Sequence, residues 1–446
     1  SPGNTVPDHP ALPAAEALRV RIEGGAAGVT TNALELVLFD EACVRRRVLL
    51  PPLDVAAGSS RILWVSSDGA TWNGDAGQQI PTFSVRARGP AAGWQAASGY
   101  QVDVVAEGLE LPVNIAFVPE PTDAPGDPFA YVTELHGQIK VITNDGTVST
   151  YASGLLNFDP LGQFPGQGEQ GLGGILVEPV TGDLFLSLLY DANGPHYPRV
   201  ERLSSADGGL TMATRTTVLD MPGEFQGQAH YVSHMELIGD GTMFVHMGDG
   251  FVTNTARDLN SFRGKILRMN LDGTAPTDNP FYTAGVHTAR DYVWCLGVRN
   301  PFGGRTRESD GQHYFLDNGP SIDRFAKVVR GRDYLWTGSN ASMRNFALYD
   351  WDPAVGPVNL AFIQPGTFGG SGFPADRMDH AFASSAGNTY ATGQQPRGKR
   401  IEEFVLDANG GLAAGPTTFV EYVGDGRSTV VGLCAGPGGL FFTDLY

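Results

Sequence analysis

The sequence is poor in cysteine and contains no long apolar run. Its 446 residues include three cysteines, Cys43, Cys295 and Cys434, so at most one disulfide can form and a disulfide framework is excluded. Cys295 and Cys434 lie in apolar, strand-like runs, and we expect both to be buried as small hydrophobic residues. No stretch reaches the roughly 20 apolar residues that a membrane helix needs. The sequence therefore predicts no membrane span.

Basic residues are also scarce. The chain has 30 Lys and Arg against 48 Asp and Glu, which gives a formal net charge of −18. Binding to nucleic acid or to an anionic membrane requires clustered Lys and Arg, so neither is expected as a partner, and the charge fits a protein that acts on neutral small molecules. The chain starts at Ser1 without an initiator Met or a charged leader. This start is consistent with a processed form, and we predict that the protein is secreted or periplasmic.

Glycine and proline, in contrast, are abundant, with 59 and 30 copies. Many short strands joined by tight turns require such a composition. Near the start of the chain, runs of strand-forming residues occur at 18–22, 34–39, 46–50 and 61–65, and they predict a small β-sandwich-like accessory module over residues 1–97. Nothing in this module has catalytic spacing, and its single histidine is His9. Residues 88–99 have the composition of a linker.

After residue 100, strand pairs closed by polar glycine turns recur about every 50 to 60 residues, and each is typical of a β-hairpin. Examples occur at 130–146, 183–189, 242–249, 313–319, 400–411 and 439–444. About 350 residues at this period correspond to close to six four-stranded blades. We therefore predict an all-β protein, in which a six-bladed β-propeller over residues 98–446 follows the small module. Loops from every blade of a propeller converge at one end of its channel, where we expect the chemistry.

Four unusual strings follow one another in the propeller region. They are His230-Tyr-Val-Ser-His234 leading to Gly248-Asp249, Phe262-Arg-Gly-Lys-Ile-Leu-Arg268, Gly297-Val-Arg-Asn-Pro301 and Asp317-Asn-Gly-Pro320. In order and spacing they resemble the glucose/sorbosone dehydrogenase family. The resemblance implies a six-bladed propeller enzyme that carries pyrroloquinoline quinone (PQQ) and Ca²⁺ and oxidises a sugar or another alcohol, with an external electron acceptor.

The resemblance also implies a catalytic base. His230 precedes Gly248 by eighteen residues, the interval at which the family's active-site histidine precedes its Gly-Asp pair. A neutral imidazole can take the proton from a sugar hydroxyl while hydride leaves the carbon for the quinone. His230 is therefore the candidate general base. His234 lies four positions later; a transition-metal pair completed by His246 or Asp249 is conceivable, but no further ligand pattern supports it.

Other matched positions imply contacts with the cofactor and the metal. Arg299 and Asn300 match family residues that contact the quinone, and an Arg fork with an Asn amide offers fixed donors to developing negative charge. The loop of Asn318, Gly319 and Pro320 matches one whose carbonyl oxygens bind the catalytic Ca²⁺, a cation that prefers oxygen ligands.

Two further residues resemble parts of the family's cofactor pocket. Glu169 occupies the place of a pocket-lining Gln or Glu, and Arg427 is similar to an arginine of a late blade that pairs with a cofactor carboxylate. The family's cofactor-binding lysine has no clean counterpart, and Arg397 or Lys399 could take its place with a shifted alignment.

Two departures from the family pattern affect the expected activity. An acidic pair that usually follows the Asn-Gly-Pro loop is replaced by Arg324-Phe325, and the acidic neighbour of the base is replaced by Ala229. These changes argue against glucose as the substrate and leave open a propeller that has lost the quinone. The alternatives are a quinone-free, Ca²⁺-dependent hydrolase, lactonase or lyase on the same propeller, and a propeller that binds a partner without catalysis.

Overall fold

The computed structural model of the protein describes residues 90–119, 126–160, 169–226, 229–284, 288–367 and 370–446, together with eight strands between residues 17 and 80. Nearly all described secondary structure is β. The helical segments are single turns, namely η1 (Thr253–Thr255), α1 (Ala289–Tyr292), α2 (Asn340–Met343) and η2 (Ala375–Arg377). An all-β fold is therefore confirmed. Among the described residues, no helix has the length and apolarity that a membrane crossing demands.

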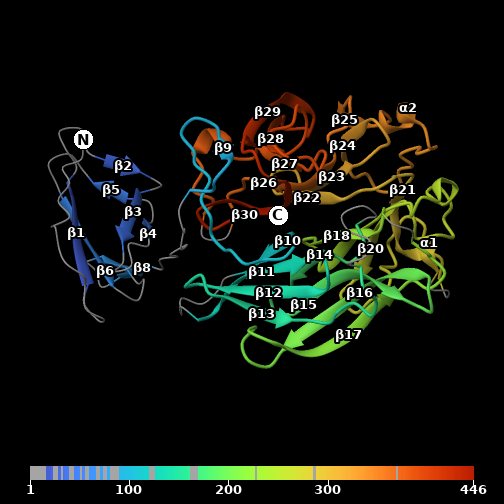
Figure 1. Ribbon diagram of the computed structural model, residues 1–446, viewed down its shortest axis with the longest axis horizontal. Helices are drawn as coiled ribbons and strands as arrows, with labels where there is room; N and C mark the ends of the chain where they lie inside the picture. The colour runs from blue at the N-terminus through green and yellow to red at the C-terminus, as the bar shows by residue number, and fades with distance from the viewer. Residues whose placement is uncertain are drawn as a thin grey trace.

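Eight strands precede the propeller, at the left of Figure 1. They are β1 (Ala17–Glu23), β2 (Val29–Thr31), β3 (Leu34–Phe39), β4 (Arg45–Leu50), β5 (Leu53–Val55), β6 (Ser60–Ser66), β7 (Thr71–Asn73) and β8 (Gln78–Ile80). Their sheet orders are β1-β6-β7-β8, β2-β5 and β3-β4. The four runs predicted near the start of the chain fall within β1, β3, β4 and β6. Their side chains, His9 and Cys43 lie outside the described residues, so the sandwich-like packing and the boundary at residue 97 stay predictions.

Five antiparallel sheets of consecutive strands form the main blades of the propeller. Blade 1 contains β10 (Pro112–Phe117), β11 (Pro128–Glu134), β12 (Gln138–Thr143) and β13 (Val148–Ala152). Blade 2 contains β14 (Leu172–Val177), β15 (Leu184–Asp191), β16 (His196–Ser205) and β17 (Met212–Asp220). Blade 3 contains β18 (Val232–Leu237), β19 (Thr242–Met247), β20 (Lys265–Asn270) and β21 (Val293–Leu296). Blade 4 contains β22 (Gly303–Arg307), β23 (Gln312–Asp317), β24 (Asp323–Lys327) and β25 (Ala347–Trp351). Blade 5 contains β26 (Pro357–Phe362), β27 (Ala381–Ser385), β28 (Arg400–Leu406) and β29 (Leu412–Tyr422).

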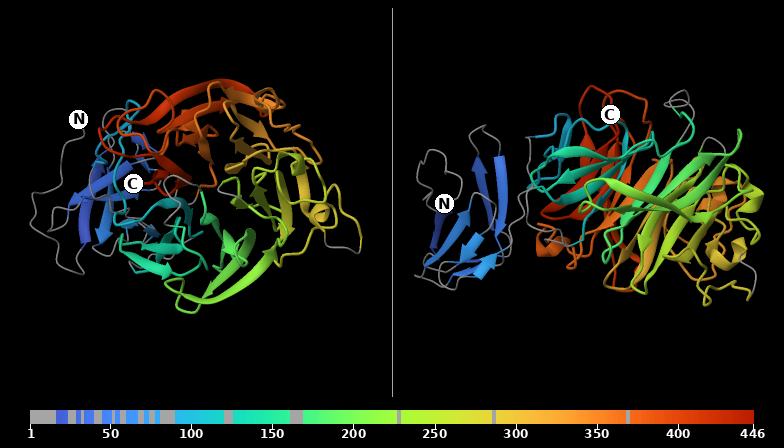
Figure 2. Two further views of the ribbon diagram at one scale, coloured as in Figure 1. Left: turned by 45° about the vertical axis from the view of Figure 1, so that its right-hand side comes forward. Right: turned by 90° about the horizontal axis from the view of Figure 1, so that it is seen from below.

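The sixth position of the ring holds a smaller sheet. It consists of β30 (Val430–Gly436) and β31 (Gly439–Asp444), and β30 contacts both β26 of blade 5 and β10 of blade 1. The ring therefore closes, as the circular sequence of colours in Figure 2 shows. The prediction of six four-stranded blades is corrected here: in the described part of the chain, five blades have at least four strands and the sixth has two.

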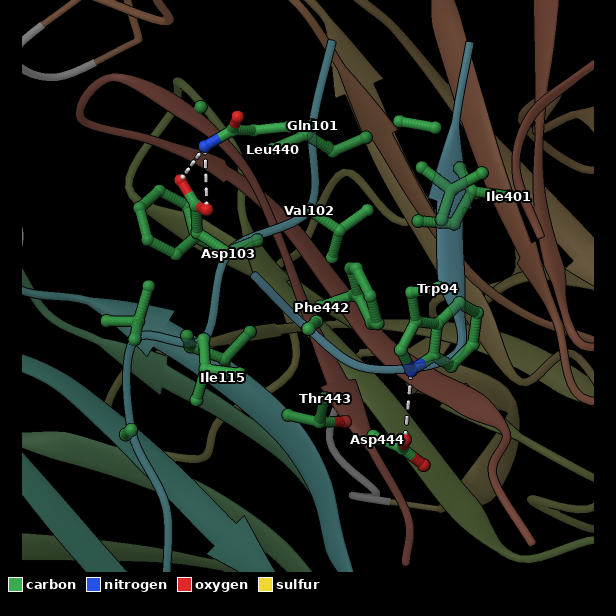
Figure 3. A pocket seen from close by; sticks show the side chains of 18 of the residues that line it. Trp94, Gln101, Val102, Asp103, Ile115, Ile401, Leu440, Phe442, Thr443 and Asp444 are labelled. Atoms are coloured by element: carbon green, nitrogen blue, oxygen red, sulfur yellow. Dashed lines mark hydrogen bonds between the residues drawn. The ribbon is translucent and has the colours of Figure 1, made fainter. Parts of the chain in front are cut away.

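A further strand joins the ring from before the first blade. β9 (Trp94–Ala96) pairs with β29 and adds a fifth strand to blade 5. Trp94 of β9 also donates a hydrogen bond from Nε1 to Asp444 of β31 at 3.1 Å. Part of the predicted linker at 88–99 is thus a strand of the propeller. A cavity of about 1120 Å³ lies here and is lined by residues of β9, β31 and blades 1 and 5 (Figure 3).

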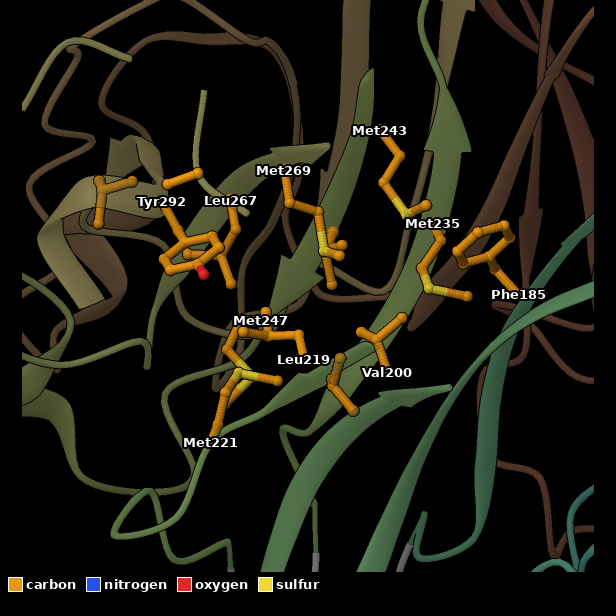
Figure 4. Packing of buried hydrophobic residues seen from close by; sticks show 14 of the residues in the cluster. Phe185, Val200, Leu219, Met221, Met235, Met243, Met247, Leu267, Met269 and Tyr292 are labelled. Atoms are coloured by element: carbon orange, nitrogen blue, oxygen red, sulfur yellow. The ribbon is translucent and has the colours of Figure 1, made fainter. Parts of the chain in front are cut away.

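The core lies between neighbouring blades. The contact between blades 2 and 3 is rich in methionine: Met221, Met235, Met243, Met247 and Met269 all lie in one buried cluster (Figure 4). Unbranched, flexible methionine side chains fill the irregular space between two twisted sheets. Cys295 and Cys434 are buried, as predicted for both, and both are free. The packing between blades fixes how their loops meet at the end of the channel.

The order of the strands gathers particular loops at one end. In a four-stranded antiparallel blade, the loop before the first strand and the loop between the second and third strands lie at the same end. Glu169, His230, Asn300 and Arg427 precede the first strands of blades 2, 3, 4 and 6. The loops of Asp249, of Asn318 and of Lys399 join second to third strands in blades 3, 4 and 5. The topology thus places all of these loops at the same end of the ring.

Candidate functional site

A buried imidazole–carboxylate pair lies at this end of the ring. Nδ1 of His230 is 2.6 Å from Oδ1 of Asp249, and Trp336 Nε1 donates to Oδ2 of the same carboxylate at 2.8 Å. His230 is 4% exposed and Asp249 1%. A carboxylate at this distance accepts the Nδ1 hydrogen, which leaves the lone pair on Nε2. No described residue hydrogen-bonds to Nε2, so this nitrogen is available to a bound molecule.

The local backbone holds the ring tightly. His230 has a positive φ of 66°, which is uncommon for a residue other than glycine and is found at functional sites. Gly248 packs against it so closely that a Cβ there would lie 2.4 Å from the His230 carbonyl oxygen. Phe251 covers the imidazole, with ring centroids 3.9 Å apart, although Phe251 itself is 57% exposed. This packing therefore requires a glycine at position 248, the first residue of the Gly-Asp pair.

Arg299 and Asn300 form the next part of the site, and Asp317 holds their backbone. The Asp317 carboxylate accepts hydrogen bonds from the amide of Arg299 at 3.1 Å and from that of Asn300 at 2.7 Å. Arg324 donates to the other side of the same carboxylate, from Nη2 at 2.7 Å. Asp317 and Arg324 are both fully buried. Arg324 and its neighbour Phe325 thus lie inside blade 4, with Phe325 in the apolar core, and neither enters the site.

Glu169 joins the two halves of the site. Its carboxylate accepts a hydrogen bond from the backbone amide of His230 at 3.0 Å and interacts with Arg299 and the side chain of Asn300. Burial raises the pKa of Glu169, and His230, Arg299 and Asn300 oppose this rise. Asn300 is 2% exposed, and its Oδ1 is a buried oxygen without a hydrogen-bond partner. An unpaired buried acceptor is costly, so Asn300 offers a contact to a bound group.

The loop of Asn318, Gly319 and Pro320 lies beside Arg299. The Asn318 carbonyl accepts a hydrogen bond from Arg299 Nη1 at 2.7 Å. No described residue donates a hydrogen bond to the carbonyl oxygens of Gly319 or Pro320, so these two oxygens could act as ligands. The loop predicted to bind the metal and the arginine predicted to contact the quinone are therefore joined by this hydrogen bond to the Asn318 carbonyl.

The three remaining cationic residues differ in their surroundings. Lys399 is 1% exposed, and its ammonium donates to the backbone carbonyls of Ala391 and Gly393. Burial lowers the pKa of Lys399. Arg397 and Arg427 are exposed, and the guanidinium of Arg427 lies 5.6 Å from the ring centroid of Tyr446. Of the two replacements considered for the missing lysine, Arg397 is the accessible one.

Two functional features were not recognised in the sequence. Trp336 and Phe251, which contact the His230–Asp249 pair, lie in loops that carry no motif, so no sequence signal marked them. His234, predicted as a possible metal ligand, lies instead with His246 and His313 inside the ring. Among the described residues, no group of three His, Cys, Asp or Glu side chains has the arrangement of a metal site.

Comparisons with known proteins show what the chain is similar to. The family model described as Glucose / Sorbosone dehydrogenase matches residues 109–368, more than half of the chain. The aldose sugar dehydrogenase YliI of Escherichia coli (strain K12) is 26% identical over 285 residues, which cover 61% of this chain and 71% of that protein.

Solved structures of related proteins share the fold. The soluble aldose sugar dehydrogenase of Escherichia coli, solved in the apo-form, superposes with a TM-score of 0.60 at 18% identity, over 79% of this chain and 96% of that one. The PQQ-bound form of the aldose sugar dehydrogenase of Streptomyces coelicolor gives a TM-score of 0.57 at 20% identity, over 79% and 92%. At such identities the likeness establishes the propeller fold alone.

Proposed function

Because this chain belongs to the glucose/sorbosone dehydrogenase family, we propose that it is a PQQ- and Ca²⁺-dependent dehydrogenase that oxidises a sugar or another alcohol. The observation that carries this proposal is the buried His230–Asp249 pair beside Asn300, whose Oδ1 has no partner. A proton acceptor and an unpaired polar group converge at one end of the ring, where a substrate and a cofactor could meet.

His230 is the general base. Nε2 takes the proton of the substrate hydroxyl while Asp249 keeps the ring in the tautomer that leaves Nε2 free. The carboxylate then stabilises the imidazolium that forms. Phe251 covers the ring from one side and excludes water from that face. Ala229, which replaces the family's acidic neighbour of the base, makes the pocket less polar at this point and argues against glucose as the substrate.

The residues present fit PQQ. The side-chain N–H groups of Arg299 and Asn300 would hold the quinone oxygens, since the Asp317 carboxylate fixes their backbone amides, and the unpaired Oδ1 of Asn300 would accept from a donor of the bound group. Glu169 would line the cofactor pocket. Arg427 and Arg397 would pair with carboxylates of the cofactor at the rim, and Lys399 would support the rim through its bonds to backbone carbonyls. When bound, PQQ would supply the ortho-quinone that accepts the hydride.

Ca²⁺ would be held by the carbonyl oxygens of Asn318, Gly319 and Pro320. Arg299 donates to the first of these oxygens, and a cation cannot share that oxygen with a guanidinium at low energetic cost. Calcium binding would therefore require Arg299 to leave Asn318, which would free its guanidinium for an anionic partner.

The remaining assignments follow from the same premise. We propose an external electron acceptor, because the two electrons removed from each substrate have to pass to an acceptor before the next turnover. We also propose a secreted or periplasmic location.

The first experiment is titration of the metal-depleted protein with PQQ, with and without Ca²⁺, followed by absorbance and calorimetry. We expect binding that depends on Ca²⁺, and turnover of sugars or alcohols with an artificial electron acceptor. A His230→Ala variant should keep PQQ binding and lose about 10²- to 10⁴-fold in kcat. Absence of PQQ binding, together with hydrolysis of lactones or esters in Ca²⁺ alone, would replace the dehydrogenase by a hydrolase or lactonase. Full turnover by His230→Ala would remove His230 as the base.

A further inference from the structure

Three buried imidazoles lie inside the ring, next to the turn that carries Arg299 and Asn300. His234 of β18 is 7% exposed, His246 of β19 is fully buried, and His313 of β23 is 3% exposed. The ring centroids of His246 and His313 are 5.1 Å apart, as are those of His234 and His246. We call these three residues the imidazole cluster. None of them takes part in the proposed chemistry.

The cluster forms a continuous line of polar contacts. Glu236 lies with Oε2 2.9 Å from Nδ1 of His313. Nε2 of His313 is 2.9 Å from Nε2 of His246, and Nδ1 of His246 is 3.1 Å from the carbonyl oxygen of Pro301. The line therefore begins at a carboxylate and ends at a backbone carbonyl.

The two ends of this line fix where the protons are. A carbonyl oxygen can only accept, so Nδ1 of His246 carries hydrogen. Burial, with His313 and His234 nearby, lowers the pKa of His246 well below its ordinary value, so the ring is neutral and its Nε2 has a lone pair. Nε2 of His313 must then donate. Its Nδ1 faces the Glu236 carboxylate at 2.9 Å and the Thr306 hydroxyl at 3.1 Å.

The charges around the cluster agree with this order. Burial favours the neutral form of Glu236, but Arg305, His313 and His234 outweigh it and lower the pKa of Glu236 to about 2. Glu236 is thus ionised. Burial lowers the pKa of His234 to about 3, which keeps that ring neutral. Arg305 of β22 is the guanidinium that faces Glu236, at 3.4 Å.

The carbonyl at the end of the line belongs to the residue that follows Arg299 and Asn300. Ser233 Oγ donates to the same Pro301 oxygen at 3.0 Å, so two donors of blade 3 hold the start of blade 4. Space for the two imidazoles is provided by Gly304 of β22. A Cβ at this position would lie 2.6 Å from Cε1 of His246 and 2.6 Å from Nε2 of His313.

We propose that His246 is a positioning residue: the hydrogen bond that its Nε2 accepts from His313 directs its Nδ1–H at Pro301 and so holds the turn of Arg299 and Asn300 in place. That this turn contacts the cofactor rests on the proposed function, whereas the hold on the turn does not. The line contacts the turn through the Pro301 carbonyl. Asp317 holds the same turn through the backbone amides of Arg299 and Asn300.

Two amide variants separate the two ends of the imidazole. The side-chain N–H₂ of His246→Asn lies where Nδ1 lies and can still donate to Pro301, whereas that of His246→Gln lies where Nε2 lies and can reach only His313. The measurement is hydrogen exchange of the backbone amides of residues 297–303 in the full chain without cofactor. We expect exchange about fivefold to tenfold faster in His246→Gln, as for one lost buried hydrogen bond, and close to wild type in His246→Asn.

The control is His380→Gln in blade 5, where the imidazole pairs with Glu403, and it should leave residues 297–303 unchanged. Equal exchange of this segment in His246→Asn and His246→Gln would overturn the proposal. If either variant fails to fold, Ser233→Ala removes the second donor to Pro301, and an unchanged segment there would also count against the hold.

Two further measurements complete the test. In selectively ¹⁵N-labelled protein, Nε2 of His313 should carry a hydrogen, while Nε2 of His246 should be unprotonated; an unprotonated Nε2 on His313 would contradict the proton order. With PQQ and Ca²⁺ added, His246→Gln should lower kcat more than it changes KM, and His246→Asn should restore kcat. If wild type binds no PQQ while the exchange difference persists, the proposed function fails and the positioning role of His246 stands.

Discussion

Asp249 is the single residue whose hydrogen bonds define the state of the candidate base. Its Oδ1 pairs with Nδ1 of His230 and accepts from the amide of Phe251 at 3.0 Å, and its Oδ2 accepts from Trp336. Asn at this position can offer its N–H₂ to Nδ1, which would move the ring hydrogen to Nε2. The base would then have no lone pair where the substrate hydroxyl lies.

We therefore expect Asp249→Asn to lower kcat by about 10³-fold or more, with PQQ affinity little changed. The measurement is steady-state turnover with PQQ and Ca²⁺, alongside the PQQ titration. Trp336→Phe, which leaves the Asp249–His230 contact in place, should lose much less activity. Equal losses in the two variants would mean that Asp249 supports the local fold rather than the tautomer.

Arg324 and Asp317 form an ion pair that is fully removed from solvent. Replacing Arg324 by Met leaves the Asp317 carboxylate buried without its cation, and such a loss costs about 3–5 kcal/mol of unfolding free energy. The measurement is the urea unfolding midpoint. The control is Arg344→Met, which removes two ion pairs, with Asp350 and Asp352, whose side chains are 47%, 28% and 53% exposed and should cost less than about 1 kcal/mol. Similar midpoints for both variants would contradict this account.

At the scale of strands, the imidazole cluster predicts a pH dependence of stability. The pKa of His234 is lowered to about 3 and that of His246 well below 6.5, so the unfolded chain binds more protons than the folded one below pH 6.5. Stability is therefore complete above pH 6.5 and falls as the pH decreases toward the folded values, by up to about 1.4 kcal/mol per pH unit for each ring.

The double variant His234→Asn/His246→Asn tests this dependence. Between pH 6.5 and 5, wild type should lose unfolding free energy more steeply than the double variant, as followed by urea unfolding at each pH. The pKa of Glu236 is lowered, so its own contribution is lost only as the pH falls below 4.5, outside this window. Parallel slopes for the two proteins would show that the two rings are not the source.

Strands were predicted well from the sequence because their signals are local. Alternation and glycine turns mark β11 with β12, and β28 with β29, within a few residues. The number of strands in the last blade was not predictable in this way, because a period along the chain counts hairpins and not the sheets they join. β9 shows the same limit: Trp94-Gln-Ala has no periodic context, and its partner β29 lies more than 300 residues later.

In the candidate site, too, the features that depend on local sequence were predictable and those that depend on long-range contacts were not. His230, Asn300 and Asn318 became candidates because their strings resemble those of a known family in order and spacing. Arg324 was identified as a departure, but its partner Asp317 depends on the register of β23 with β24, where the two residues are opposite one another. His246 and His313 lie 67 residues apart in different blades. Which faces of two blades meet depends on their twist and packing, and no local pattern contains that information.

At the scale of the whole molecule, the ring closes across a narrow junction. Blade 5 and blade 1 are connected through the two-stranded sixth sheet, and β9 fastens this sheet to blade 5. Trp94 makes that link: its ring packs edge-on against Tyr422 of β29 and Phe442 of β31, at 5.3 and 4.9 Å. Its Nε1 reaches Asp444, 350 residues later in the chain. One side chain of β9 thus contacts two separate segments of the closure, β29 and β31.

Removing this side chain should open the ring locally. We expect Trp94→Ala to lower the unfolding free energy by about 3–5 kcal/mol, as for other large aromatic truncations, and to speed hydrogen exchange first in β9, β30 and β31. Trp94→Phe keeps the ring contacts and loses one hydrogen bond, at about 1 kcal/mol. Trp351→Ala serves as the control, since Trp351 donates to Glu402 within the body of blades 4 and 5, and its exchange changes should be centred on those blades. If Trp94→Ala raised exchange evenly around all the blades, the junction would not be where the ring opens, because a closed ring without a weak point has to loosen as a whole.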